Sequence, residues 1–179
     1  MARRQEETEP QSSLRREAVR FANALIQRAD TSAGYAAEDV ANMLKFIGIH
    51  LTWSPESDVV ALTRAARRQH AYKPDGLPLP GDIVLFHNQW DRNGNQKGDD
   101  WLTGCGVVVV RSADRFEAVI RTGHRPRRVV VSPGMPSVHR KDGVIINSFV
   151  RLPTRTDRAD TEYLAGQLFA GFIDLDKLP

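Results

Sequence analysis

The order of the hydrophobic patterns along the chain is the feature that most limits its fold. Up to about residue 69, apolar residues recur every three or four positions, the spacing of amphipathic helices. From residue 83 onward, short apolar runs typical of strands follow one another. The intervening segment 73–81 is dense in proline and glycine. Helices and strands that are segregated in this way predict an α+β fold, because a parallel α/β sheet would require them to alternate.

Three amphipathic helices are expected before the turn-rich segment. They span about residues 13–25, 36–47 and 54–69. Ser13 is an N-cap residue at the start of the first helix. Gly48 follows the second helix, at the position where glycine commonly ends one. Pro55 occupies the first turn of the third helix, where its missing N–H is tolerated.

About five strands and one further helix are expected after the turn-rich segment. The apolar runs are 83–86, 107–110, 116–120, 129–131 and 144–150. Polar turns separate them, which indicates an antiparallel sheet joined by short connections. Asp160-Thr161-Glu162 then precedes Leu164, Leu168, Phe169 and Phe172 at helical spacing. These residues predict a C-terminal helix.

Length and composition favour a single domain. The 179 residues suffice for one core of ordinary size, and we assign residues 13–179 to it. Residues 1–12 are polar, and we expect a flexible tail or an arm that orders on a partner. The one cysteine, Cys105, excludes an intrachain disulfide. No run approaches the roughly 18 apolar residues of a membrane span, and no signal peptide is recognisable, so we expect a cytoplasmic protein.

The segment Pro80-Gly81-Asp82-Ile83-Val84-Leu85-Phe86, after three expected helices, resembles a conserved turn and first core strand of the NlpC/P60 (CHAP-like) cysteine peptidase and amidase family. The likeness covers residues 14–151. It implies a papain-like α+β fold in which a cysteine at a helix start works with a histidine and a third polar residue on the sheet. Many members cleave amide bonds in bacterial cell-wall peptides. The thiol must be ionised to attack, which the helix N-terminus and the imidazole promote.

The three chemical positions of the family motif are not retained. The nucleophile motif Asp-Cys-Ser-Gly-Phe-Val aligns with residues 35–40 and places Ala36, or Ala37 in a shifted register, at the cysteine. The histidine motif Thr-His-Val-Gly-Val-Val aligns with residues 103–108 and places Gly104 at the histidine. Ile120 falls at the third position. The resemblance therefore implies a pseudoenzyme without catalytic residues, which keeps the scaffold and binds a protein or peptide.

An active cysteine amidase or peptidase, exported as an effector by a non-classical route, is the alternative. It would use Cys105 as a relocated nucleophile, with His87 or His124 as the base. However, Cys105 lies on an expected strand between two glycines, away from any helix N-terminus. We therefore expect it to be a small buried hydrophobic residue.

A loop rich in Asp and Asn, residues 91–100, separates two expected strands. Four oxygen-bearing side chains follow calcium-loop spacing, namely Asp91, Asn93, Asn95 and Asp99. The loop lacks the central glycine and the closing glutamate of a calcium loop, because Gln96 and Leu102 occupy those positions. The loop could therefore bind Ca²⁺ or be held by hydrogen bonds between its own residues in Asx turns. We expect the Asx turns, and no cofactor.

The densest positive cluster is a candidate partner site. It comprises Arg121, Arg125, Arg127 and Arg128. A nucleic-acid-associated protein would account for such a cluster, but no aromatic residues are interleaved for base stacking. The net charge is only +3. We therefore expect a solvated face or an acidic protein partner rather than nucleic acid.

Overall fold

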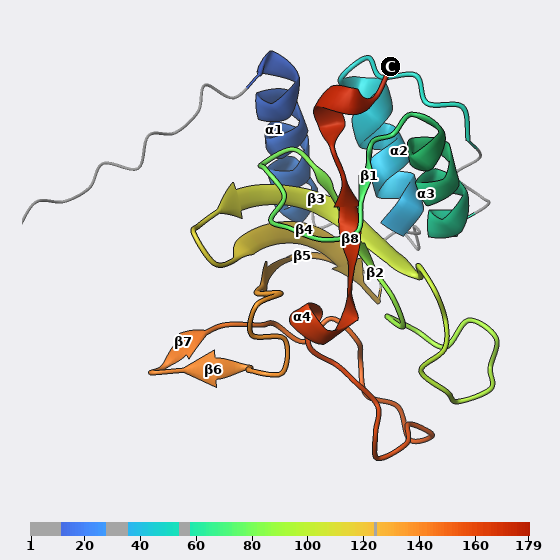
Figure 1. Cartoon of the computed structure of the whole chain (residues 1–179), viewed down its shortest axis with the longest axis vertical. Helices are drawn as coiled ribbons and strands as arrows, with labels where there is room; N and C mark the ends of the chain where they lie inside the picture. The colour runs from blue at the N-terminus through green and yellow to red at the C-terminus, as the bar shows by residue number, and fades with distance from the viewer. Residues whose placement is uncertain (1–11, 28–35, 54–57, 124) are drawn as a thin grey trace, which may run out of the picture.

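The computed structural model describes residues 12–27, 36–53, 58–123 and 125–179. In this part of the chain it forms a mixed α+β structure, which confirms the predicted class (Figure 1). The helices are α1 (Ser13–Gln27), α2 (Ala36–Phe46), α3 (Asp58–Arg68), α4 (Ala165–Leu168) and the 3₁₀ helix η2 (Leu175–Lys177). The strands are β1 (Tyr72–Lys73), β2 (Ile83–Phe86), β3 (Gly104–Arg111), β4 (Phe116–Thr122), β5 (Arg125–Val131), β6 (Arg140–Lys141), β7 (Val144–Ile145) and β8 (Phe169–Ile173).

Six of these strands form one antiparallel sheet. Its order is β1-β8-β2-β3-β4-β5. Strands β2 to β5 are sequential neighbours; short turns join β3 to β4 and β4 to β5, whereas the longer segment 87–103 joins β2 to β3. The remaining two strands, β6 and β7, form a separate hairpin that projects from the body of the molecule (Figure 1).

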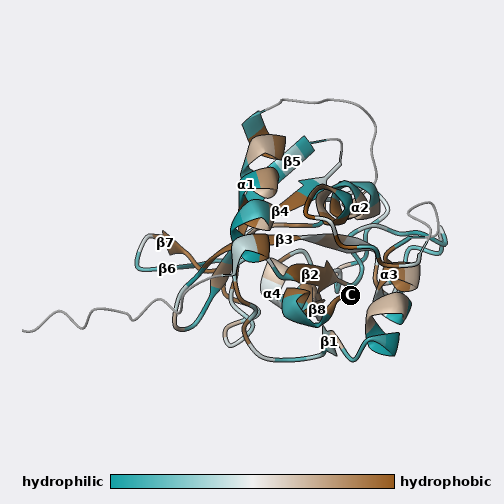
Figure 2. Cartoon of the chain, turned by 90° about the horizontal axis from the view of Figure 1, so that it is seen from above, coloured by the Kyte–Doolittle hydropathy of each residue, from teal (hydrophilic) through white to brown (hydrophobic). Residues whose placement is uncertain are grey.

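Each face of the sheet has its own core. On one face, α1, α2 and α3 cover apolar side chains that include Leu85 and Val107. On the other face, α4 and the segment before it cover a second cluster that includes Phe86 and Ile120. The alternation of Leu85 and Phe86 between the clusters follows from the two-residue repeat of a strand. The central strands are accordingly brown in Figure 2, while the helices alternate between apolar and polar positions.

The N-terminal helices follow the sequence prediction. Helix α1 begins at Ser13, and α2 spans Ala36–Phe46. Gly48 then adopts a φ of 80°, a conformation that glycine reaches without steric cost. Helix α3 is described from Asp58 to Arg68, so the predicted start at Ser54-Pro55-Glu56 lies outside the described residues.

The predicted C-terminal helix is wrong in its main part. Only Ala165–Leu168 is helical, and Phe169–Ile173 forms β8 in the interior of the sheet. Gly171 has a φ of 99°, and a Cβ there would lie 2.3 Å from the carbonyl oxygen of Lys73. The close approach of the chain at β1 therefore requires glycine. The pairing with β1 and β2 outweighs the local helical spacing.

The predicted strand 144–150 is also shorter than expected. Only Val144 and Ile145 are in a strand, β7. The polar residues that follow bind the edge of β5 instead: Ser148 N–H donates to the carbonyl of Val130, and the Asn147 side chain accepts from Ser132 N–H. These contacts hold the segment beside β5 without a regular ladder.

The Pro-Gly-Asp turn that carries the family resemblance has a structural role. Asp82 is buried and accepts hydrogen bonds from Arg15 of α1, from Leu79 N–H and from Leu175 N–H. Gly81 has a φ of 97°, and a Cβ there would meet the Arg15 backbone at 3.0 Å. The turn thus ties α1 and the C-terminal segment to the start of β2.

Candidate binding site

A cavity with a volume of about 520 Å³ is formed by described residues. It lies where the first residues of α2 and α3 approach the ends of the central strands. Its walls come from α2 and α3, the segment after β2, the end of β4 and the segment 150–154. The lining residues are Ala36, Ala37, Asp58, Val59, Gln89, Trp90, Asp91, Arg92, Thr103, Arg121, Gly123, Val150, Arg151, Leu152 and Thr154.

Gln89 and Thr103 fix one wall of the cavity. Both are buried, and Gln89 N–H donates to the Thr103 hydroxyl over 2.7 Å. The Gln89 side-chain amide donates to the carbonyl of Arg121 over 2.9 Å. The indole N–H of Trp90 donates to the Thr103 carbonyl over 3.1 Å. These bonds join the segment after β2 to β3 and β4, so this wall is held in one arrangement.

Two cavity arginines have firmly bound partners. Arg121 of β4 donates from Nε and Nη2 to the two carboxylate oxygens of Asp39, at 2.8 and 2.9 Å. Arg151 donates to Asp157 over 2.8 Å and to the carbonyl of Asn88 over 2.9 Å. The two guanidinium groups are 5% exposed, so their pairs are sheltered from water.

The rim of the cavity combines apolar surface with one exposed ion pair. Trp90 is 49% exposed and Leu152 is 54% exposed, although both contribute to the lining. Arg92 forms an ion pair with Asp58, which joins the segment after β2 to α3. Apolar surface combined with a few polar groups is typical of a ligand pocket.

The three motif positions do not converge on the cavity. Ala36 and Ala37 line it, at the start of α2. Gly104 does not line it, and a Cβ there would lie 1.9 Å from the side-chain oxygen of Gln89. Ile120 is buried in the core on the sheet face opposite α2. In this part of β4, Arg121 rather than Ile120 contacts α2.

Cys105 is not placed as a nucleophile. Its side chain is 1% exposed, and burial, with a smaller contribution from Asp39, raises the pKa of the Cys105 thiol well above its usual range. His87 accepts a hydrogen bond from Leu102 N–H at its Nδ1 atom, and burial lowers the pKa of His87. The other proposed base, His124, lies outside the described residues.

Side-chain oxygens of the Asp/Asn loop are engaged within the loop. Asp91 accepts from Asn95 N–H and Gln96 N–H, while Asn93 and Asn95 each accept from a backbone N–H two residues later. Asp99 accepts from the side-chain amides of Asn93 and Asn95. This is the geometry of consecutive Asx turns. No cluster of three or more His, Cys, Asp or Glu residues with metal-binding geometry occurs among the described residues.

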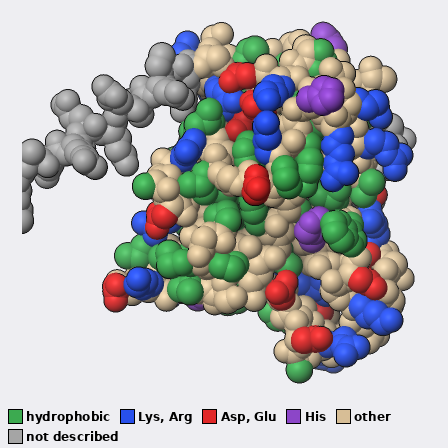
Figure 3. Space-filling view, viewed as in Figure 1, with side chains coloured by type: hydrophobic (Ala, Val, Ile, Leu, Met, Phe, Trp, Pro, Cys, Tyr) green, Lys and Arg blue, Asp and Glu red, His purple; other side chains and the backbone are tan. Residues whose placement is uncertain are grey.

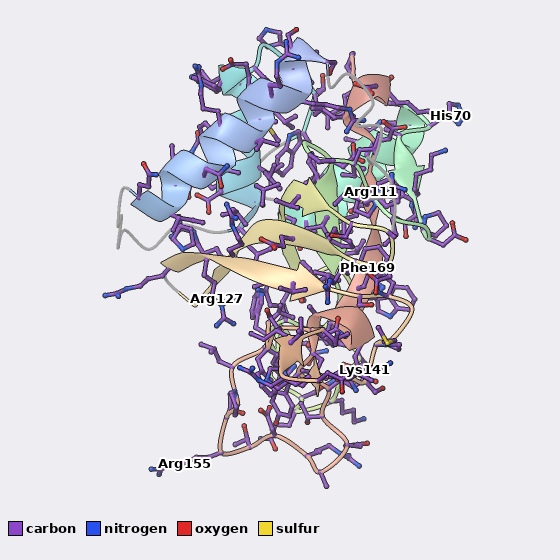
Figure 4. The ribbon with its side chains drawn as sticks, turned by 90° about the vertical axis from the view of Figure 1, so that its left-hand side faces the viewer. His70, Arg111, Arg127, Lys141, Arg155 and Phe169 are labelled. Carbon is purple, nitrogen blue, oxygen red and sulfur yellow. The ribbon has the colours of Figure 1, made fainter. Side chains whose placement is uncertain are left out.

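The predicted arginine cluster is divided. Arg121 is buried against Asp39, whereas Arg128 contacts Glu117 and Asn23. Arg127 donates to the carbonyl of Phe149, and Arg125 is exposed. Figure 4 shows Arg127 well separated from Arg111 and from Lys141 of the hairpin. On the face in Figure 3, acidic and basic side chains are intermixed around apolar surface.

Comparison of the chain with protein-family models, with curated proteins and with solved structures finds no match. In the described part of the chain, none of the helices combines the length and the apolar character needed to cross a membrane.

Sequence reasoning missed several residues of the cavity. Asp58 begins α3, Gln89 and Arg92 belong to the segment after β2, and Leu152 lies in the segment 150–154, so no short motif links them. Asp39 lay inside the motif alignment, but its partner Arg121 is 82 residues away. The mixture of polar residues after the apolar run of β2 was the one local signal, since functional residues often follow the end of a core strand.

Proposed function

We propose that this protein is a non-catalytic binding module, a degenerate relative of the NlpC/P60 family whose cavity holds a segment of a peptide or protein partner. The observation that carries the proposal is the composition of the cavity wall at the start of α2. Ala36 and Ala37 stand where the family resemblance requires a nucleophile, and neither side chain can attack a carbonyl.

The chemistry of the remaining lining supports binding rather than hydrolysis. The cavity hydroxyl of Thr103 accepts a hydrogen bond from Gln89 N–H, and no histidine lines the described walls. Triad-type hydrolysis needs a nucleophile with a base in hydrogen-bond reach. The buried position of Cys105 disfavours the amidase alternative, and the paired arginines disfavour nucleic acid.

The cavity suits an extended peptide with an apolar side chain. Trp90 and Leu152 offer exposed apolar surface at the rim, and burial of such surface is the main source of affinity for a short segment. Backbone amides of the peptide would then meet the polar side chains of the lining. Aromatic anchors of this kind are enriched at protein interfaces.

Selection from a library of phage-displayed peptides tests the proposal. Enriched peptides are synthesised, and their affinity is measured by calorimetry for the wild type, Leu152→Asp and Val144→Asp. Val144 is 50% exposed on β7 and does not line the cavity, so it is a matched control for an added charge. We expect Leu152→Asp to weaken binding about tenfold or more and Val144→Asp to leave it unchanged. No enrichment, or equal affinity for all three proteins, would contradict the proposal.

A further inference from the structure

The exposed ion pair at the cavity rim differs from the other charged pairs of this site. Arg92 and Asp58 are 32% and 41% exposed in their side chains, whereas Arg121 and Arg151 are 5% exposed. Water and salt screen an exposed pair far more than a buried one. Of the three guanidinium groups that line the cavity, Arg92 is therefore held least firmly.

The pair connects two separate walls of the cavity. Asp58 begins α3, and Arg92 belongs to the segment after β2. Arg92 also donates to the carbonyl of Trp101 over 3.1 Å, and its backbone N–H donates to Asp100 over 3.0 Å. The Arg92 backbone is thus held within the Asp/Asn loop, while its guanidinium group reaches across to α3.

Asp58 does not depend on Arg92 for all of its hydrogen bonds. Its second oxygen accepts from Val60 N–H over 2.7 Å, which caps the start of α3. Opening the ion pair leaves this cap in place. The lining residues Ala37, Val59 and Gln89 are buried, at 3%, 3% and 8% exposure, in contrast to the partly exposed ion pair.

From these contacts we propose that the Arg92–Asp58 pair is a strap that regulates access to the cavity. The closed pair spans part of the rim, and its opening admits the ligand segment between α3 and the segment after β2. The inference concerns the site of the proposed function and rests on it. We therefore expect ionic strength, and the charges of Arg92 and Asp58, to control the rate at which a molecule enters the cavity. The cavity walls should stay unchanged.

Thiol accessibility tests the strap without any ligand. Ala36→Cys places a thiol on the cavity wall, and its reaction rate is measured with the uncharged reagent 4,4′-dithiodipyridine. The rate is compared with that of Ala36→Cys/Arg92→Gln and of Ala36→Cys/Asp58→Asn. Asparagine keeps an oxygen for the α3 cap, so the second variant separates loss of the strap from loss of the helix start. Val144→Cys, alone and with each strap substitution, is the exposed control.

We expect each strap substitution to accelerate labelling of the cavity thiol about two- to fivefold, the range that an exposed ion pair allows. About 1 M NaCl, which shortens the Debye length to about 3 Å, should accelerate Ala36→Cys but neither double variant. The Val144→Cys rates should not change. Acceleration of less than about twofold in both double variants would overturn the proposal. Equal acceleration of Val144→Cys labelling by the strap substitutions would overturn it as well. Because the assay contains no peptide, this outcome is independent of whether peptides bind.

Discussion

Arg121 of β4 holds both carboxylate oxygens of Asp39 in the first turn of α2, across 82 residues of sequence. The pair is sheltered, with side-chain exposures of 5% and 18%. It fixes α2 against the sheet beside the cavity, which Arg121 helps to line.

Breaking this pair on one side should be costly. Asp39→Asn removes the carboxylate that both Arg121 nitrogens bind, and we expect a loss of about 3 kcal/mol in the free energy of unfolding. Urea denaturation measures the loss. Asp39→Asn/Arg121→Met should recover part of it, because the buried guanidinium charge is removed together with the carboxylate. Equal stability of wild type and Asp39→Asn would show that the pair does not hold α2.

Replacing Gly104 with the family's histidine should destabilise the protein rather than activate it. A Cβ at this position would lie 1.9 Å from the Gln89 side chain, so Gly104→His forces Gln89 out of place. Overpacking of this kind costs about 1–3 kcal/mol. Gly104→His/Gln89→Ala should be more stable than Gly104→His alone. Denaturation curves that show no recovery in the double variant would contradict this explanation.

The fold could be predicted further than the site. The periodicity of apolar residues located α1, α2 and the core strands. A helix with one buried face and a strand with both faces buried each leave a recognisable pattern. The periodicity failed at β8, where Phe169 and Phe172 continue the helical spacing of α4 but pairing with β1 and β2 decides the conformation. Motif alignment selected Ile120, yet strand register places Arg121 toward α2. A shift of one residue reverses the face of a strand, and only the sheet reveals it.

The segment 152–163 should lose stability in acid because of Asp157. Burial raises the pKa of Asp157, but hydrogen bonds from Arg151, Thr154 and Tyr163 lower it by more. The pKa of Asp157 therefore lies well below its usual range. In the unfolded chain the pKa is about 3.9, so below that pH the unfolded state takes up the proton more readily than the folded state. The stabilisation is thus complete at neutral pH and declines as pH falls from about 4 towards the folded-state pKa.

Asp157→Asn provides the measurement. Its free energy of unfolding should be lower than that of the wild type at neutral pH, and the difference should narrow as pH falls below about 4. Urea denaturation at a series of pH values gives both curves. A difference that stays constant over the whole series would contradict the role of the Asp157 carboxylate.

Cys105 should be inert in the folded protein. Its side chain is 1% exposed, and burial raises the pKa of its thiol, so little thiolate is available. We expect labelling by 4,4′-dithiodipyridine to be slow in native conditions and to accelerate by orders of magnitude in denaturant. Val144→Cys supplies the rate of an exposed thiol. A native Cys105 that reacts as fast as this control would support the amidase alternative.

The direct test of a non-catalytic binding module is the fate of a bound peptide. Peptides from the phage selection are incubated with the wild-type protein at concentrations that saturate binding, and their masses are followed by mass spectrometry. We expect each peptide to bind the wild type, to bind Leu152→Asp more weakly and to remain intact at long incubation. Cleavage of a bound peptide at a defined amide bond by the wild type, absent in Leu152→Asp, would contradict it and make this protein a hydrolase.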